Sequence, residues 1–98
     1  MAREQSMVNN HRTKNTTVLL VDDEPDILEL LELTLRKMDL EVDRAANVRE
    51  ALAKLGARRY GLCLTDMRMP DGDGMQVVQH IVQNNLDVPV AVITAHGN

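Results

Sequence analysis

Apolar residues in this chain form short continuous runs that alternate with stretches of helical periodicity. The run TVLLV at residues 17–21 is rich in β-branched side chains, as is typical of a strand buried on both faces. The runs GLCLT at residues 61–65 and VPVAVIT at residues 88–94 predict two further buried strands, the second with Pro89 at its entry. The more polar EVDRAA at residues 41–46 predicts a strand at an edge of the sheet.

Between these runs, apolar residues recur at the 3.6-residue spacing of amphipathic helices. Pro25 suits the first turn of a helix, where its missing N–H costs nothing, and this helix is expected to run to about Met38. Asn47 followed by Glu50 predicts a capping box at the start of a second helix. The three expected apolar stripes are Ile27, Leu28, Leu31, Leu35 and Met38; Val48, Ala51, Leu52 and Leu55; and Met75, Val78, Ile81 and Val82.

The order of these elements, β-α-β-α-β-α-β, predicts an α/β fold with a doubly wound parallel sheet. We expect the strand order 2-1-3-4, in which the first and third strands are neighbours. Residues 1–16 are polar and unpatterned, so we interpret them as a flexible leader before a folded unit at residues 17–98. A chain of 98 residues forms one small domain at most.

Three of the expected strands end in polar residues that carry chemistry. Asp22 and Asp23 follow the first strand, Asp66 follows the third, and Thr94 ends the fourth. In an open parallel sheet, ligands bind beyond the carboxyl ends of the strands, at the point where the strand order reverses. We therefore expect the three aspartates to converge there, with Thr94 one strand further along.

Carboxylates gathered in this way repel one another, by roughly 3 kcal/mol for each pair about 5 Å apart at an effective dielectric near 20. A hard divalent cation with oxygen ligands, Mg²⁺ in a cell, relieves that repulsion and leaves coordination positions for phosphate oxygens. The cluster therefore predicts phosphoryl chemistry with one carboxylate as nucleophile. Asp66 is the better candidate because it stands alone on the central strand, and Thr94 is suited to donate a hydrogen bond to a phosphoryl oxygen.

Composition narrows the classes of partner. The formal net charge of −4 and an aromatic content of 1% argue against nucleic acid binding by this segment, because both phosphate-binding charge and base-stacking side chains are lacking. The single cysteine, Cys63, lies within an apolar run and provides no disulfide framework. The chain has no long apolar stretch typical of a signal peptide or a membrane span, so we expect a cytoplasmic protein without membrane contacts.

Three sequence segments together are highly specific: VLLVDDEPDI, LCLTDMRMPDGDG and VAVITAHGN. Over residues 17–98 they resemble the receiver domain of two-component response regulators. Within that family, LTDMRMPDGDG and ITAHGN are most similar to the NtrC-type enhancer-binding regulators. The resemblance implies a flavodoxin-like sheet that serves as a phosphorylation-dependent switch rather than as a turnover enzyme.

The resemblance also assigns a role to each candidate site residue. Asp66 would be the phosphoacceptor. Asp23 and Asp66 would bind Mg²⁺ directly together with the backbone carbonyl of Arg68, whereas Asp22 would act largely through water. Thr94 would be the switch hydroxyl that moves to meet the phosphoryl group.

Partners and domain limits follow from the same resemblance. It implies a cognate histidine kinase, an output domain with a transcriptional role, and a homodimer. A receiver of this family continues through a fourth helix, a fifth strand ending in a phosphoryl-binding lysine, and a fifth helix, so we expect a domain truncated after its fourth strand. The strand at residues 88–94 would then be an unprotected edge and the inner side of the first strand would be partly bare, which predicts poor stability or self-association.

One alternative function stays open on the sequence alone. A structural interaction or dimerisation module could keep the receiver shape without being phosphorylated. Other classes fit poorly: a haloacid-dehalogenase-type phosphotransferase needs Asp-x-Asp, but Arg68 follows Asp66 at that spacing and Glu24 follows Asp22. An EF-hand loop lacks its required glutamate, and a dinucleotide-binding domain lacks its glycine fingerprint.

Overall fold

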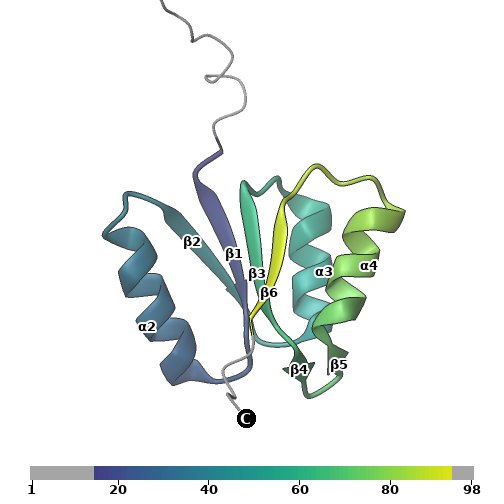
Figure 1. Cartoon of the computed structure of the whole chain (residues 1–98), viewed down its shortest axis with the longest axis horizontal. Helices are drawn as coiled ribbons and strands as arrows, with labels where there is room; N and C mark the ends of the chain where they lie inside the picture. The colour runs from purple at the N-terminus through teal and green to yellow at the C-terminus, as the bar shows by residue number, and fades with distance from the viewer. Residues whose placement is uncertain (1–14, 94–98) are drawn as a thin grey trace, which may run out of the picture.

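Helices and strands alternate along the chain as the hydrophobic pattern predicts, with one short hairpin added after the third strand (Figure 1). The computed structural model describes residues 15–93, so most of the expected leader and Thr94 lie outside the described residues. The elements are β1 (Thr17–Val21), α2 (Pro25–Arg36), β2 (Glu41–Ala45), α3 (Val48–Ala57), β3 (Leu62–Asp66), β4 (Arg68–Met69), β5 (Gly72–Asp73), α4 (Gly74–Gln83) and β6 (Val90–Ile93).

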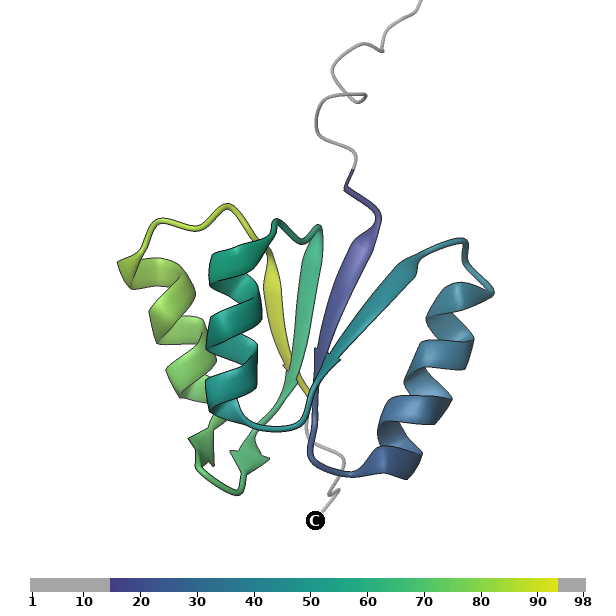
Figure 2. The same cartoon turned by 180° about the vertical axis from the view of Figure 1, so that it is seen from behind.

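Four of the strands form one parallel sheet in the order β2-β1-β3-β6. Helix α2 lies against one face of this sheet, and α3 and α4 lie against the other (Figures 1 and 2). The predicted doubly wound sheet and its strand order are therefore confirmed, β6 being the fourth strand of the prediction. No helix among residues 15–93 has the length and apolar character needed to cross a membrane.

The central strand β1 is buried along its whole length, as its continuous apolar sequence predicts. Its side chains alternate between two clusters: Leu19 and Val21 belong to the core beneath α3 and α4, whereas Val18 and Leu20 share a cluster with Leu28 of α2. The expectation that the inner side of this strand would be partly bare is wrong, because α2 covers it.

The last strand of the sheet, β6, is less well covered than β1. The prediction placed this strand at residues 88–94, but β6 begins two residues later and spans Val90–Ile93 within the described residues. In the described part of the chain β6 lies at one edge of the sheet and β2, as predicted, at the other, and the side chains of β6 are half-buried or exposed. The thinner packing thus falls on β6 and not on β1.

Two of the predicted helical stripes need correction. Helix α2 ends at Arg36, two residues before Met38, whose side chain is 62% exposed. In α4 Ile81 of the predicted stripe is buried, but Val77, which the stripe omits, is buried as well, while Val82 of the stripe is 67% exposed. The stripe predicted for α3 is confirmed, with Leu52 partly buried beside three buried residues.

The starts of α3 and α4 are fixed by side-chain caps. Asn47 accepts a hydrogen bond from the Glu50 N–H at 2.8 Å, as expected, but the Glu50 carboxylate accepts from the N–H of Ala46 rather than from Asn47. A complete capping box forms instead at α4, where Asp73 and Gln76 exchange both hydrogen bonds. These caps set the directions in which the two helices leave the carboxyl edge of the sheet.

Candidate metal centre

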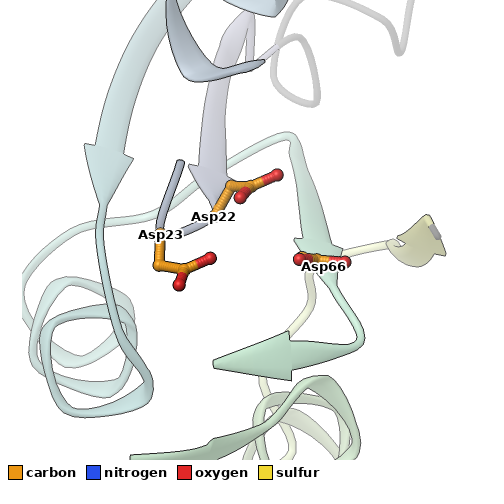
Figure 3. A group of neighbouring side chains, drawn as sticks. All are labelled: Asp22, Asp23 and Asp66. Carbon is orange, nitrogen blue, oxygen red and sulfur yellow. The ribbon is translucent and has the colours of Figure 1, made fainter. Parts of the chain in front are cut away.

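The three predicted aspartates lie together at the carboxyl edge of the sheet (Figure 3). Asp22 and Asp23 directly follow β1, and Asp66 ends the neighbouring strand β3. The parallel register pairs Val21 with Thr65, so the two strands end side by side. One carboxylate oxygen from each aspartate lies within 4.8 Å of one from each of the others.

Backbone hydrogen bonds orient two of these carboxylates. The N–H of Glu24 donates to Asp22 Oδ1 at 3.0 Å, and the N–H of Met67 donates to Asp66 Oδ1 at 2.8 Å. Asp22 and Asp66 are 4% and 6% exposed, whereas Asp23 is exposed to solvent. The site is therefore a pair of held, buried carboxylates with a third at its mouth.

Within residues 15–93, no ion pair balances the charges in this cluster. Burial raises the pKa of Asp22 above its usual value, and the charges of Asp66 and Asp23 act in the same direction, while the hydrogen bond from Glu24 opposes them. The ion pairs formed among residues 15–93 join other side chains and involve none of the three aspartates. This donor set of oxygens alone, with unrelieved negative charge, fits Mg²⁺.

The main chain of Asp66 is packed closely against the start of α4. The N–H of Gly74 donates to the carbonyl of Met67 at 2.7 Å, and a Cβ at Gly74 would lie 2.3 Å from the Asp66 carbonyl oxygen. The buried hydroxyl of Thr65 donates to that same carbonyl at 3.0 Å. Glycine is thus required at the start of α4, because the helix approaches the backbone of Asp66 closely.

The remaining predicted site residues are placed less completely. Arg68 begins β4, two residues beyond Asp66, and pairs with Asp73 across the hairpin. The role of its backbone carbonyl as a metal ligand stays a prediction. Thr94, the expected switch hydroxyl, lies outside the described residues. The hairpin of β4 and β5 is not among the elements that the hydrophobic pattern predicts.

A family model described as a response regulator receiver domain matches residues 18–98. The chain belongs to this family. The receiver domain is 55% identical over 80 residues to the response regulator protein PilR of Pseudomonas aeruginosa. That match covers 82% of this chain and 18% of PilR, so the chain spans about a fifth of the length of this curated relative.

Solved structures support the same assignment. The response regulator TrrA of Thermotoga maritima, determined with Mg²⁺ and BeF, is 36% identical with a TM-score of 0.79, over 84% of this receiver domain and 71% of TrrA. TrrA is also known in complex with the histidine kinase ThkA. The beryllofluoride-activated NtrC4 receiver domain dimer is 37% identical with a TM-score of 0.77, over 85% of this chain and 69% of NtrC4. Receiver domains are signalling modules of two-component regulators, and this chain has their fold.

Proposed function

We propose that this receiver domain accepts a phosphoryl group on Asp66. The observation that carries the proposal is the gathering of three carboxylates at the ends of β1 and β3. We assign Mg²⁺ to Asp22, Asp23 and Asp66 and to the backbone carbonyl of Arg68, with Asp22 acting largely through water. The structure of TrrA with Mg²⁺ and BeF lends support, because it is a related receiver fold with a bound cation.

In the proposed step, a carboxylate oxygen of Asp66 forms a bond to the phosphorus atom of the donor. The bond between phosphorus and the donor's leaving group breaks, and the leaving group departs with the electron pair. Bound Mg²⁺ would supply charge neutralisation for the phosphoryl oxygens. The Met67 N–H holds the Asp66 carboxylate in orientation, and the Thr94 hydroxyl donates to a phosphoryl oxygen of the product.

The proposed partners follow from the family. A cytoplasmic histidine kinase would donate the phosphoryl group, as the complex of TrrA with ThkA suggests. Leu30 and Leu33 of α2 are 61% and 55% exposed, and a protein partner would cover such apolar side chains. The receiver unit at residues 17–98 would control an output domain with a transcriptional role, and the NtrC4 dimer supports dimerisation as one means of control.

Phosphorylation of the full-length protein tests this function. Incubation with Mg²⁺ and acetyl phosphate is expected to produce a base-labile phosphate on Asp66, detected by mass spectrometry. The substitution Asp66→Asn removes the nucleophile and should abolish the product. Asp87→Asn is the matched control, because Asp87 is exposed in the loop before β6, away from the carboxyl edge.

The result also separates the two candidate functions. A structural interaction module without phosphorylation would give no phosphate in the wild-type protein, with or without Mg²⁺. Equal labelling of the wild-type and Asp66→Asn proteins would likewise overturn the assignment of Asp66. Chelation by EDTA should stop labelling of the wild-type protein without unfolding it, because the fold contains two apolar clusters that need no metal.

A further inference from the structure

The segment after Asp66 carries the only main-chain ligand of the proposed metal set. Arg68 is exposed and belongs to a hairpin whose strands β4 and β5 are two residues long. The hydrogen bonds of so short a hairpin do not hold its backbone in place, because isolated two-stranded hairpins are only marginally stable in water. Additional contacts must therefore hold the Arg68 backbone beside Asp66.

Two of these contacts hold the base and the first strand of the hairpin. The N–H of Gly74 closes the segment onto the Met67 carbonyl, and the side chain of Met69 is buried in the core beneath α3 and α4. The Asp73 cap ties the end of the hairpin to α4. The tip, at residues 70–71, follows directly on Met69 and takes part in none of these contacts itself.

The tip is held by the carboxylate of Asp71. Its Oδ1 accepts a hydrogen bond from the N–H of Val48 at 2.8 Å, and its Oδ2 accepts from the N–H of Arg49 at 3.1 Å. These are the first two residues of α3, and both N–H groups are helix-terminal donors without an intrahelical acceptor. Each carboxylate oxygen therefore joins the hairpin to a helix more than 20 residues away in sequence.

The Asp71 carboxylate is not needed as the local cap of α3, so its two hydrogen bonds serve to join the hairpin to the helix. Asn47 already caps the third N–H of α3, that of Glu50, so the helix has its own local cap. Gly72 packs close to α3 as well, since a Cβ there would lie 3.2 Å from a methyl of Val48. The hydrogen bonds with the helix N–H groups lower the pKa of Asp71, which stays ionised at neutral pH.

We propose that Asp71 is a positioning residue for the metal centre: by clamping the hairpin tip to the start of α3, it holds the Arg68 carbonyl in place for Mg²⁺. This inference rests on the proposed function and adds a residue that the comparisons and the sequence do not assign. A variant that breaks the clamp should therefore bind Mg²⁺ more weakly than a variant that destabilises α3 by the same amount but keeps the clamp.

Two variants break the clamp from opposite sides. Asp71→Ala removes both acceptors, and Val48→Pro removes the N–H that donates to Oδ1 without changing any charge. Proline is favoured at the first position of a helix, and Asn47 before it is already extended. The controls are Asn47→Ala, which weakens the start of α3 but leaves the clamp, and Val48→Ala, which shortens the side chain but keeps the N–H.

Mg²⁺ affinity of the full-length protein, measured by calorimetric titration, is the main readout. Both clamp variants should bind Mg²⁺ on the order of 10-fold more weakly, the low end of the range for groups that orient metal ligands. Amide hydrogen exchange across residues 67–74 should accelerate in both without Mg²⁺. Asn47→Ala should leave both readouts unchanged, and Val48→Ala, which loses the methyl near Gly72, should change both much less than Val48→Pro does, even where the unfolding midpoints fall equally far.

Three outcomes are informative. If clamp and control variants weaken Mg²⁺ binding equally, or if the clamp variants bind as the wild type does, the positioning role is wrong while phosphorylation of Asp66 is unaffected. If Asp71→Ala does not fold, the comparison of Val48→Pro with Val48→Ala tests the positioning role by itself. If the wild-type protein neither binds Mg²⁺ nor accepts phosphate, the proposed function fails, and this inference falls with it.

Discussion

A single aspartate of β2, Asp43, and the three aspartates at the carboxyl edge lie on the same sheet in opposite surroundings. Asp43 of β2 accepts a hydrogen bond from the buried Tyr60 hydroxyl at 2.7 Å and forms an ion pair with Arg58 at 3.1 Å. The guanidinium of Arg58 also lies 5.6 Å from the centre of the Tyr60 ring. Asp22, Asp23 and Asp66 instead face one another across the carboxyl edge of β1 and β3.

The contrast separates a structural carboxylate from a ligand site. At Asp43 the Tyr60 hydroxyl and the Arg58 guanidinium compensate the negative charge of the carboxylate, so Asp43 stabilises the fold without a ligand. At the carboxyl edge, backbone N–H groups orient the carboxylates but leave their mutual repulsion in place. Folding places these like charges together at a cost in stability, which a bound cation would offset.

The largest effect is expected from Asp23→Asn. This substitution removes a proposed direct ligand from the exposed mouth of the cluster, so Mg²⁺ affinity should fall by about 100-fold or more, beyond what loss of an indirect partner causes. Asp43→Asn is the matched control and should leave Mg²⁺ affinity unchanged. Calorimetric titration measures both affinities. Equal Mg²⁺ affinities of the two variants would contradict the assignment of Asp23 as a ligand and of Asp43 as a structural residue.

Gly74→Ala tests the backbone of Asp66 without altering any charge. The added methyl would lie 2.3 Å from the Asp66 carbonyl oxygen, so the start of α4 or the end of β3 must shift. We expect a loss of about 1–3 kcal/mol in the free energy of unfolding, as in other overpacked sites, together with slower phosphorylation. Gly56→Ala is the control, since nothing lies within 4 Å of a Cβ there. Equal stability of the two variants would contradict the close approach.

Asp22→Asn should stabilise the protein in the absence of Mg²⁺. Asparagine keeps the acceptor for Glu24 but removes one of the repelling charges, and we expect a gain of about 1 kcal/mol after solvent screening reduces the full Coulomb term. Added Mg²⁺ should reduce or reverse the difference, because it stabilises the wild type, which binds it more tightly, more than the variant. Chemical denaturation at neutral pH, with and without Mg²⁺, measures both.

The pH dependence of this difference follows from the raised pKa of Asp22. The folded protein holds the proton more tightly than the unfolded chain, so the wild type loses stability relative to the variant as pH rises through the folded pKa. The advantage of Asp22→Asn should therefore be present at neutral pH and vanish as pH falls towards the ordinary value of 3.8. An advantage that grows on acidification would show that repulsion is not its cause.

Tyr60→Phe should have the smallest effect, and only on stability. The buried hydroxyl loses its bond to Asp43, which still keeps Arg58, so the free energy of unfolding should fall by about 1 kcal/mol. Mg²⁺ affinity and the rate of phosphorylation should match the wild type. A change in either would mean that the two acidic groups are coupled through the sheet.

The errors of sequence interpretation are instructive in α4. The predicted stripe of Met75, Val78, Ile81 and Val82 includes the buried Ile81 but omits the buried Val77, because periodicity alone does not say on which side of Ile81 the buried face lies. The Asp73 cap and the close approach of Gly74 to Asp66 set the rotation of the helix, and these contacts bury Val77 and Ile81. Asp71 was missed for a similar reason, because its partners are the first N–H groups of a distant helix.

The chain's own sequence determined the alternation of strands and helices and the gathering of Asp22, Asp23 and Asp66. Both follow from local rules, since continuous apolar runs make buried parallel strands and the ends of neighbouring strands meet at one edge. Only the tertiary structure decided which face of α4 is buried, that α2 covers β1, and that Asp71 reaches α3. Those features depend on how elements far apart in sequence approach one another in space, and the spacing of residues within one element does not determine that approach.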